Sequence, residues 1–222
     1  MTSFGAALLA AVLLTDFRLL GGSRLVALIR IAGAQGALLG VLAALAQGPA
    51  ADLATGLAVG TIALKGLLLP QLLQRAIRRV EIRREVEPIV GYSASLALGV
   101  LALAGAGWVA GDLPLPRSDA PALLVPASLF TGYTGLFLVV ARRKAITQAL
   151  GYLVFENGIY GFGLAIAHEE PLLVQLGVLL DLLVAVFVMG IIVFHIQRDF
   201  DHIDVDRLDA LGEAPGAEVG RP

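Results

Sequence analysis

The sequence contains no cysteine. A chain without cysteine forms no disulfide, gives no thiolate to an iron–sulfur cluster and has no thiol nucleophile. Its only histidines, His168, His195 and His202, are predicted to lie at helix ends or in a tail, so they are badly placed for a bis-histidine haem. We therefore expect this chain to bind no metal and no cofactor, and any redox centre to reside on a partner.

Charge is also scarce. Only 15% of the 222 residues are charged and 58% are apolar, whereas a soluble domain has roughly 25% charged and 45–50% apolar residues. The net charge of −2 offers no basic patch, so nucleic acid is not expected as a partner. The composition is that of a protein whose solvent is the lipid bilayer.

What the sequence does have is a succession of apolar runs, each near the length of about 20 residues that crosses a bilayer as a helix. They predict an all-α membrane protein, a polytopic bundle of about seven transmembrane helices. The runs fall at 4–21, 24–46, 52–74, 88–110, 121–141, 145–167 and 172–196. Asp16 and Arg18 follow Leu14 in the first run, which predicts a short or tilted span with snorkelling ends.

Basic residues collect in the odd-numbered connections, from Arg18 and Arg24 in the first to Arg142, Arg143 and Lys144 in the fifth, and the even ones have few. By the positive-inside rule this predicts an N-terminus outside and a C-terminus in the cytoplasm. We divide the chain into a four-helix membrane region (1–120), a three-helix membrane region (121–197) and an acidic cytoplasmic tail (198–222). Glycines such as Gly36 with Gly40 and Gly158 with Gly161 are typical of close helix packing.

Three ionisable residues are predicted to lie near the bilayer midplane. Counted from the outer ends of their predicted helices at about 1.5 Å per residue, Lys65, Glu156 and Asp181 lie roughly 15–19 Å deep. A charge at that depth costs at least about 2.5–3.5 kcal/mol on insertion scales. One interpretation is a structural tether in which Lys65 pairs with one acid. The other is a proton relay, because a carboxyl group in a low dielectric favours its neutral form and can load and release a proton.

Polar neighbours favour the relay, because amides and phenols can hold water between carboxyl groups. The candidates for this polar path are Asn157, Tyr152, Tyr160, Gln175 and Gln35.

Several segments resemble the hydrogenase-4 component E family, a membrane subunit of group 4 hydrogenase and formate hydrogenlyase complexes. They are GYLVFENGIYGFG, LGVLLDLLVAVFVMGIIVFHI with the following HIDVDRL, and, in the first half, SRLVALIRIAGAQGALLG and AVGTIALKGLLLPQLLQRAIRR. Helices five to seven are further similar to the K subunit of complex I and the C subunit of Mrp antiporters. There, a glutamate in the middle of the second helix belongs to a hydrophilic axis for protons, and Glu156 matches it. The K subunit's second glutamate has no clear match, and Asp181 is the nearest acid.

The resemblance implies a non-catalytic subunit of a complex-I-like oxidoreductase in a prokaryotic inner (plasma) membrane. Its partners would be antiporter-like and H-like membrane subunits and a peripheral nickel–iron hydrogenase module. Glu156 would hold the proton, Asp181 would be a second station and Lys65 would tune them. Two alternatives stay open: a membrane scaffold that carries no protons, and a cation/proton antiporter subunit.

Overall fold

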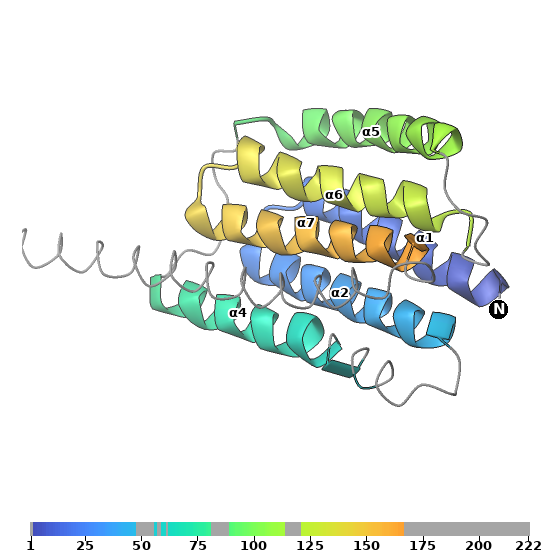
Figure 1. The fold of residues 1–222 in the computed structure, drawn as a ribbon. Coiled ribbons are helices and arrows are strands. Elements are labelled where there is room, and N and C mark those ends of the chain that lie inside the picture. The colour runs from blue at the N-terminus through green and yellow to red at the C-terminus, as the bar shows by residue number, and fades with distance from the viewer. Residues whose placement is uncertain are drawn as a thin grey trace, which may run out of the picture.

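The computed structural model describes residues 2–47, 56, 59–60, 62–80, 89–113 and 121–166. Every regular element in these ranges is a helix (Figure 1). The predicted seventh span, with Gln175 and Asp181, lies outside the described residues. The helices are α1 (Thr2–Leu20), α2 (Leu25–Gln47), the π-helical turn η1 (Ile62–Leu68), α4 (Leu69–Val80), α5 (Tyr92–Asp112), α6 (Leu124–Ala141) and α7 (Ala145–Ile166).

Four of the described helices are long and apolar enough to cross a membrane. The spans are Ser3–Leu20, Leu25–Leu45, Tyr92–Asp112 and Leu124–Ala141. Each lies within a few residues of an apolar run, because the runs end where turn-forming or charged residues begin. The helical class of the fold is thereby confirmed for the described residues, whereas the total of seven helices and their orientation stay predictions.

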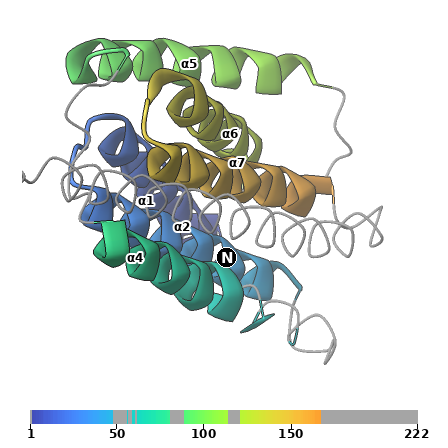
Figure 2. The same cartoon turned by 90° about the vertical axis from the view of Figure 1, so that its left-hand side faces the viewer.

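The helices form a bundle with α5 at one edge and α4 at the opposite edge (Figures 1 and 2). Helices α6 and α7 run side by side near its middle and are joined by a short connection. Their backbones meet because glycines face each other. A Cβ atom at Gly158 would lie 2.6 Å from Gly132 Cα, and one at Gly151 would lie 2.8 Å from Gly135 O. Small residues at such positions let membrane helices pack closely.

The first helix differs from its prediction. It is continuous from Thr2 to Leu20, and Asp16, which we expected to snorkel, is 0% exposed. Only Arg18 keeps the exposure that a snorkelling residue would have. The prediction for Asp16 was wrong because it counted apolar residues along the chain and ignored which face of the helix the acid occupies.

The third predicted helix is not a plain α-helix. A π-helical turn (Ile62–Leu68) precedes α4, and α4 continues to Val80 in the direction expected for the basic segment after Arg75. Pro70 gives the physical reason for the turn. It has no N–H to donate to the carbonyl of Gly66, and its ring would clash with that carbonyl in a regular α-helix. The wider π-helical turn relieves this conflict.

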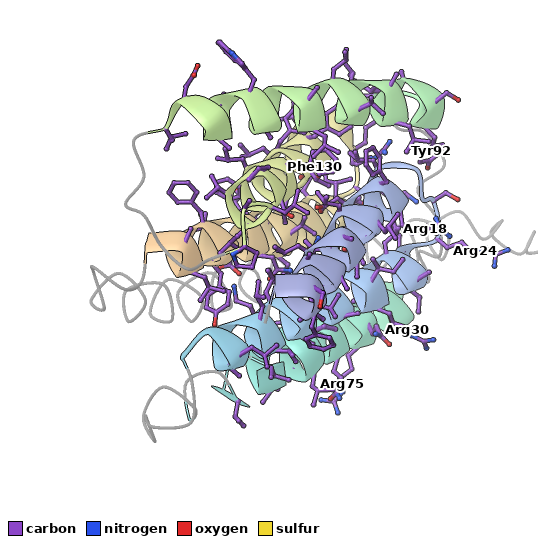
Figure 3. All side chains as sticks on the ribbon, turned by 90° about the vertical axis from the view of Figure 1, so that its right-hand side faces the viewer. Arg18, Arg24, Arg30, Arg75, Tyr92 and Phe130 are labelled. Carbon is purple, nitrogen blue, oxygen red and sulfur yellow. The ribbon has the colours of Figure 1, made fainter. Side chains whose placement is uncertain are left out.

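Three connections meet at one end of the bundle around Arg142. The Arg142 guanidinium, only 1% exposed, donates hydrogen bonds to Leu20 O at 2.8 Å and Val90 O at 3.1 Å. It also lies 4.8 Å from the ring centroid of Tyr92, which Figure 3 shows on the same side of the bundle as Arg18 and Arg24. We call Arg142 and these partners the Arg142 cluster. The sequence analysis counted Arg142 only as one of the basic residues of a connection. In the structure, Arg142 links the ends of α1, α5 and α6.

The buried apolar residues form two main clusters that lie towards opposite ends of the helices. One includes Leu19 of α1, Leu28 of α2 and Val154 of α7. The other includes Leu9 of α1 and Leu39 of α2. Between these two clusters, buried polar side chains lie on the same helices: Asp16 on α1, Gln35 on α2, and Glu156 and Asn157 on α7.

Candidate functional site

A layer of buried polar side chains separates the two apolar clusters in the middle of the bundle. Every member is at most 4% exposed. We call this set the polar layer, and it consists of Asp16, Gln35, Lys65, Thr131, Glu156 and Asn157. Its members come from α1, α2, η1, α6 and α7. Because each is flanked along its helix by buried apolar residues, the layer is a built feature of the bundle interior.

Asp16 is held by two side chains from other helices. Gln35 Nε2 donates a hydrogen bond to Asp16 Oδ1 at 2.7 Å. Thr131 Oγ1 donates to Asp16 Oδ2 at the same distance of 2.7 Å. Gln35 Nε2 also lies 3.1 Å from Thr15 Oγ1. These short bonds to a carboxyl group join α1, α2 and α6 at one point.

Asn157 extends this network into α7. Its Nδ2 donates to Gln35 Oε1 at 3.2 Å and to Ala32 O at 3.3 Å. Gln35 is therefore both a donor to Asp16 and an acceptor from Asn157. The network runs from Thr131 through Asp16 and Gln35 to Asn157, the residue next to Glu156.

Lys65 and Glu156 face a common cavity that Asn157 also lines. The cavity offers about 10 Å³ to the centre of a water-sized sphere, which is near the lower limit for one water molecule. Lys65 Nζ lies 5.1 Å from the ring centroid of Tyr160, within the range of a cation–π interaction. A lysine and a glutamate thus line one small cavity inside the bundle, whose other walls are mostly apolar.

The backbone around Lys65 fits closely against α2. A Cβ atom at Gly36 would lie 2.8 Å from Lys65 Cβ and 3.3 Å from Asn157 Oδ1. A Cβ atom at Gly33 would lie 3.1 Å from Gly66 O. These glycines allow the π-helical turn to approach α2, so that Lys65 enters the layer from the side opposite to Asp16.

The structure places most of the predicted polar residues together. The polar layer contains four of them, Lys65, Glu156, Asn157 and Gln35. Tyr160 lies next to the layer, because Lys65 Nζ lies over its ring. Tyr152 is 36% exposed, so its side chain lies largely outside the layer. Gln175 and Asp181 are outside the described residues. Among the described residues, no group of three or more His, Cys, Asp and Glu side chains is arranged to hold a metal ion.

Two members of the layer, Asp16 and Thr131, were missed by the sequence analysis. A signal for Asp16 existed in the spacing of α1. Leu9, Val12, Asp16 and Leu19 are all buried and recur at intervals of three and four residues, the period of one helix face. An acid on an otherwise apolar face of a membrane helix points into the protein, whatever its distance from the helix end.

Comparison with known proteins yields relatives over most of the chain. The uncharacterised protein Rv0085 of Mycobacterium tuberculosis is 33% identical over 193 residues, which cover 83% of this chain and 85% of that protein. Hydrogenase-4 component E of Escherichia coli is 30% identical over 149 residues, covering 66% of this chain and 68% of the relative. No family model matches the chain, and no solved structure matches it significantly. The extent of the second match shows that this chain belongs to the hydrogenase-4 component E family.

Proposed function

We propose that this chain is a membrane subunit of a complex-I-like hydrogenase assembly and that its polar layer carries part of a proton path. The observation that supports the proposal is that Lys65 and Glu156, both buried, line one small cavity inside the bundle. Ionisable groups inside a membrane are costly and are candidates for ion pathways. The partners would be antiporter-like and H-like membrane subunits and a peripheral nickel–iron hydrogenase module in a prokaryotic plasma membrane.

In this proposal Glu156 holds the proton. Its carboxyl group takes up a proton from water on one side of the path and releases it on the other. Lys65, across the same cavity, sets the electrostatic cost of the charged form of Glu156, because an opposite charge nearby favours a carboxylate. Asp181 would be a second station on the predicted seventh helix. The similarity of the C-terminal half to the complex I K subunit and the Mrp antiporter C subunit belongs to this proposal as well.

The test is proton translocation by the assembled complex in sealed vesicles. Glu156→Gln keeps the size of the side chain but cannot take up a proton. We expect it to lower translocation by about tenfold or more, as for loss of a proton-transfer group, while hydrogen chemistry by the partner module continues. Asp112→Asn is the matched control, because Asp112 is an exposed acid at the end of α5 and should leave translocation unchanged. Normal translocation by assembled Glu156→Gln would contradict the proposal.

The same measurement separates the alternatives. A scaffold without protons would lose assembled complex in the Glu156→Gln variant and translocate normally in whatever assembles. A cation/proton antiporter subunit would show translocation that depends on sodium in the external buffer.

A further inference from the structure

We infer that Asp16 is a second proton-binding group of this chain, linked to Glu156 through Gln35 and Asn157. The inference rests on the proposed function and adds a residue of the first helix to its path. The step is a simple protonation. A water-borne proton forms an O–H bond with a carboxylate oxygen of Asp16 and returns to water when that bond breaks, and no electron is transferred.

The first argument is the nature of the partners of Asp16. Both of the side chains that donate hydrogen bonds to Asp16, the Gln35 amide and the Thr131 hydroxyl, are neutral. Within the described ranges, Arg18 and Arg30 on the packed helices are exposed, and the buried ammonium group of Lys65 faces the cavity that Glu156 lines and lies 5.1 Å from the ring centroid of Tyr160. No ion pair with a described residue therefore fixes the charge of Asp16. An acid in an ion pair must break that pair before it gains a proton. Asp16 has no such pair with a described residue, so it can be protonated without this cost.

The second argument is the link to Glu156. The side-chain nitrogen of Gln35 donates a hydrogen bond to Asp16, and its side-chain oxygen accepts one from Asn157. A change in the charge of Asp16 alters how strongly Gln35 is held, and this reaches Asn157, the neighbour of Glu156. Hydrogen-bonded side chains in a low dielectric polarise one another in this way. The network of Asp16 thus ends at Asn157, which lines the same cavity as Glu156, and we expect a change of charge at one carboxyl group to be felt at the other.

The third argument is a polar atom that the protein itself does not satisfy. Thr134 Oγ1 is fully buried and has no hydrogen-bond partner among the described residues. Thr134 lies one turn beyond Thr131 on α6, on the course from Asp16 towards Arg142. Buried hydroxyl groups without a protein partner are commonly satisfied by water. A water molecule there would be a donor and acceptor of protons close to Asp16.

A purely structural role explains the burial of Asp16 less well. A neutral amide at this position could accept from Gln35 through its oxygen and donate to the Thr131 hydroxyl through its nitrogen, without placing an ionisable group in the low dielectric of the interior. The amide residues of the layer, Gln35 and Asn157, already join α2 to α7 in this manner. An acid adds one property that they lack, which is a change of charge.

The experiment has an infrared and a transport measurement. The full chain in lipid nanodiscs is followed by infrared difference spectroscopy through a pH step, where each carboxyl group that gains a proton adds a C=O band. Asp16→Asn should remove one such band, and Glu156→Gln a different one. Thr131→Val, which removes a donor to Asp16, should move the pH at which the Asp16 band changes. Ser128→Ala is its control, because Ser128 is a buried hydroxyl of the same helix that donates to Leu124 O and not to Asp16, and it should leave that midpoint in place.

In the assembled complex, Asp16→Asn should lower proton translocation by about tenfold, and Asp16→Glu should restore most of it. If the Asp16→Asn variant does not assemble, the Thr131→Val spectra still decide. If no carboxyl band of Thr131→Val changes at a different pH from the unmodified chain, the inference is overturned. Normal translocation in Asp16→Asn with loss in Glu156→Gln overturns the inference alone, whereas normal translocation in both overturns the proposed function.

Discussion

The polar layer and the Arg142 cluster both hold a charged group inside the bundle, but they hold it differently. Arg142 donates to backbone carbonyls, Leu20 O and Val90 O, which the helix ends hold in fixed positions. Asp16 accepts hydrogen bonds from side chains, Gln35 and Thr131, whose rotamers can change. The first arrangement satisfies backbone groups that a helix end leaves unpaired. The second leaves a charged group that can change state without moving the backbone.

Under the proposed function, this difference would distinguish a structural charge from charges that change their protonation state. Arginine is always protonated and offers several donors at once, which suits a fixed tie between helix ends. Carboxyl groups can gain and lose protons, and within the described part of the chain both buried acids, Asp16 and Glu156, lie in the polar layer. The three predictions that follow test whether the two regions divide in this way, beginning with the largest expected effect.

Arg142→Ala should strongly reduce the stability of the chain. The change leaves the buried Leu20 O without its side-chain donor, at about 1–3 kcal/mol for an unsatisfied group, removes one of the two donors to the partly buried Val90 O, and removes the contact with Tyr92. We expect a total loss of about 3 kcal/mol or more. Unfolding of the full chain in mixed micelles, followed by circular dichroism, measures it. Arg143→Ala is the matched control, because Arg143 is exposed. Equal losses of stability in the two variants would contradict the conclusion that Arg142, unlike Arg143, holds the helix ends together.

Gly158→Ala should have an intermediate effect on stability. Its Cβ would lie 2.6 Å from Gly132 Cα and 2.9 Å from Ser128 O, and backbone atoms cannot yield as a flexible side chain does. We expect a cost of about 1–3 kcal/mol from overpacking. Gly163→Ala is the control, because no described atom lies within 4 Å of the Cβ position at Gly163. The same unfolding measurement applies, and a harmless Gly158→Ala would show that α6 and α7 can separate at no cost.

The smallest expected difference is between Thr131→Val and Thr134→Val. Thr131 donates to a buried carboxyl group, so its loss should cost about 1–2 kcal/mol. Thr134 has a buried hydroxyl group without a partner among the described residues, and an apolar side chain of the same shape should be close to neutral there. Unfolding midpoints of the two variants in one lipid mixture give the comparison. A larger cost at Thr134 than at Thr131 would place the important hydrogen bond elsewhere.

Much of the fold could be predicted from the sequence, because apolar length and turn signals determine where membrane helices begin and end. The predicted run at 145–167 and α7 (Ala145–Ile166) agree almost exactly in their bounds. Lys65 and Glu156 stood out because each is a charge far from both ends of its apolar run. Their roles remain proposals.

The features that were missed depend on three-dimensional packing. Asp16 lies near the end of α1 in sequence, and only its helix face shows that it points inwards. To predict the π-helical turn at Lys65, one must know that the helix continues through Pro70. Arg142 lies in a basic connection, where exposed and buried arginines look the same in sequence. In each case a one-dimensional count of depth or charge cannot show which neighbours surround the side chain.

The position of the polar layer between two apolar clusters also has an electrical consequence. Apolar protein and lipid tails resist the movement of ions, so most of the voltage across the membrane falls over the two clusters and little of it over the layer between them. Moving one elementary charge across the whole membrane at 100 mV corresponds to about 2.3 kcal/mol, and half of that is about 1.2 kcal/mol. In the proposed function, a proton held in the polar layer would therefore have crossed part of the membrane voltage, and the occupancy of the layer would depend on the energisation of the membrane.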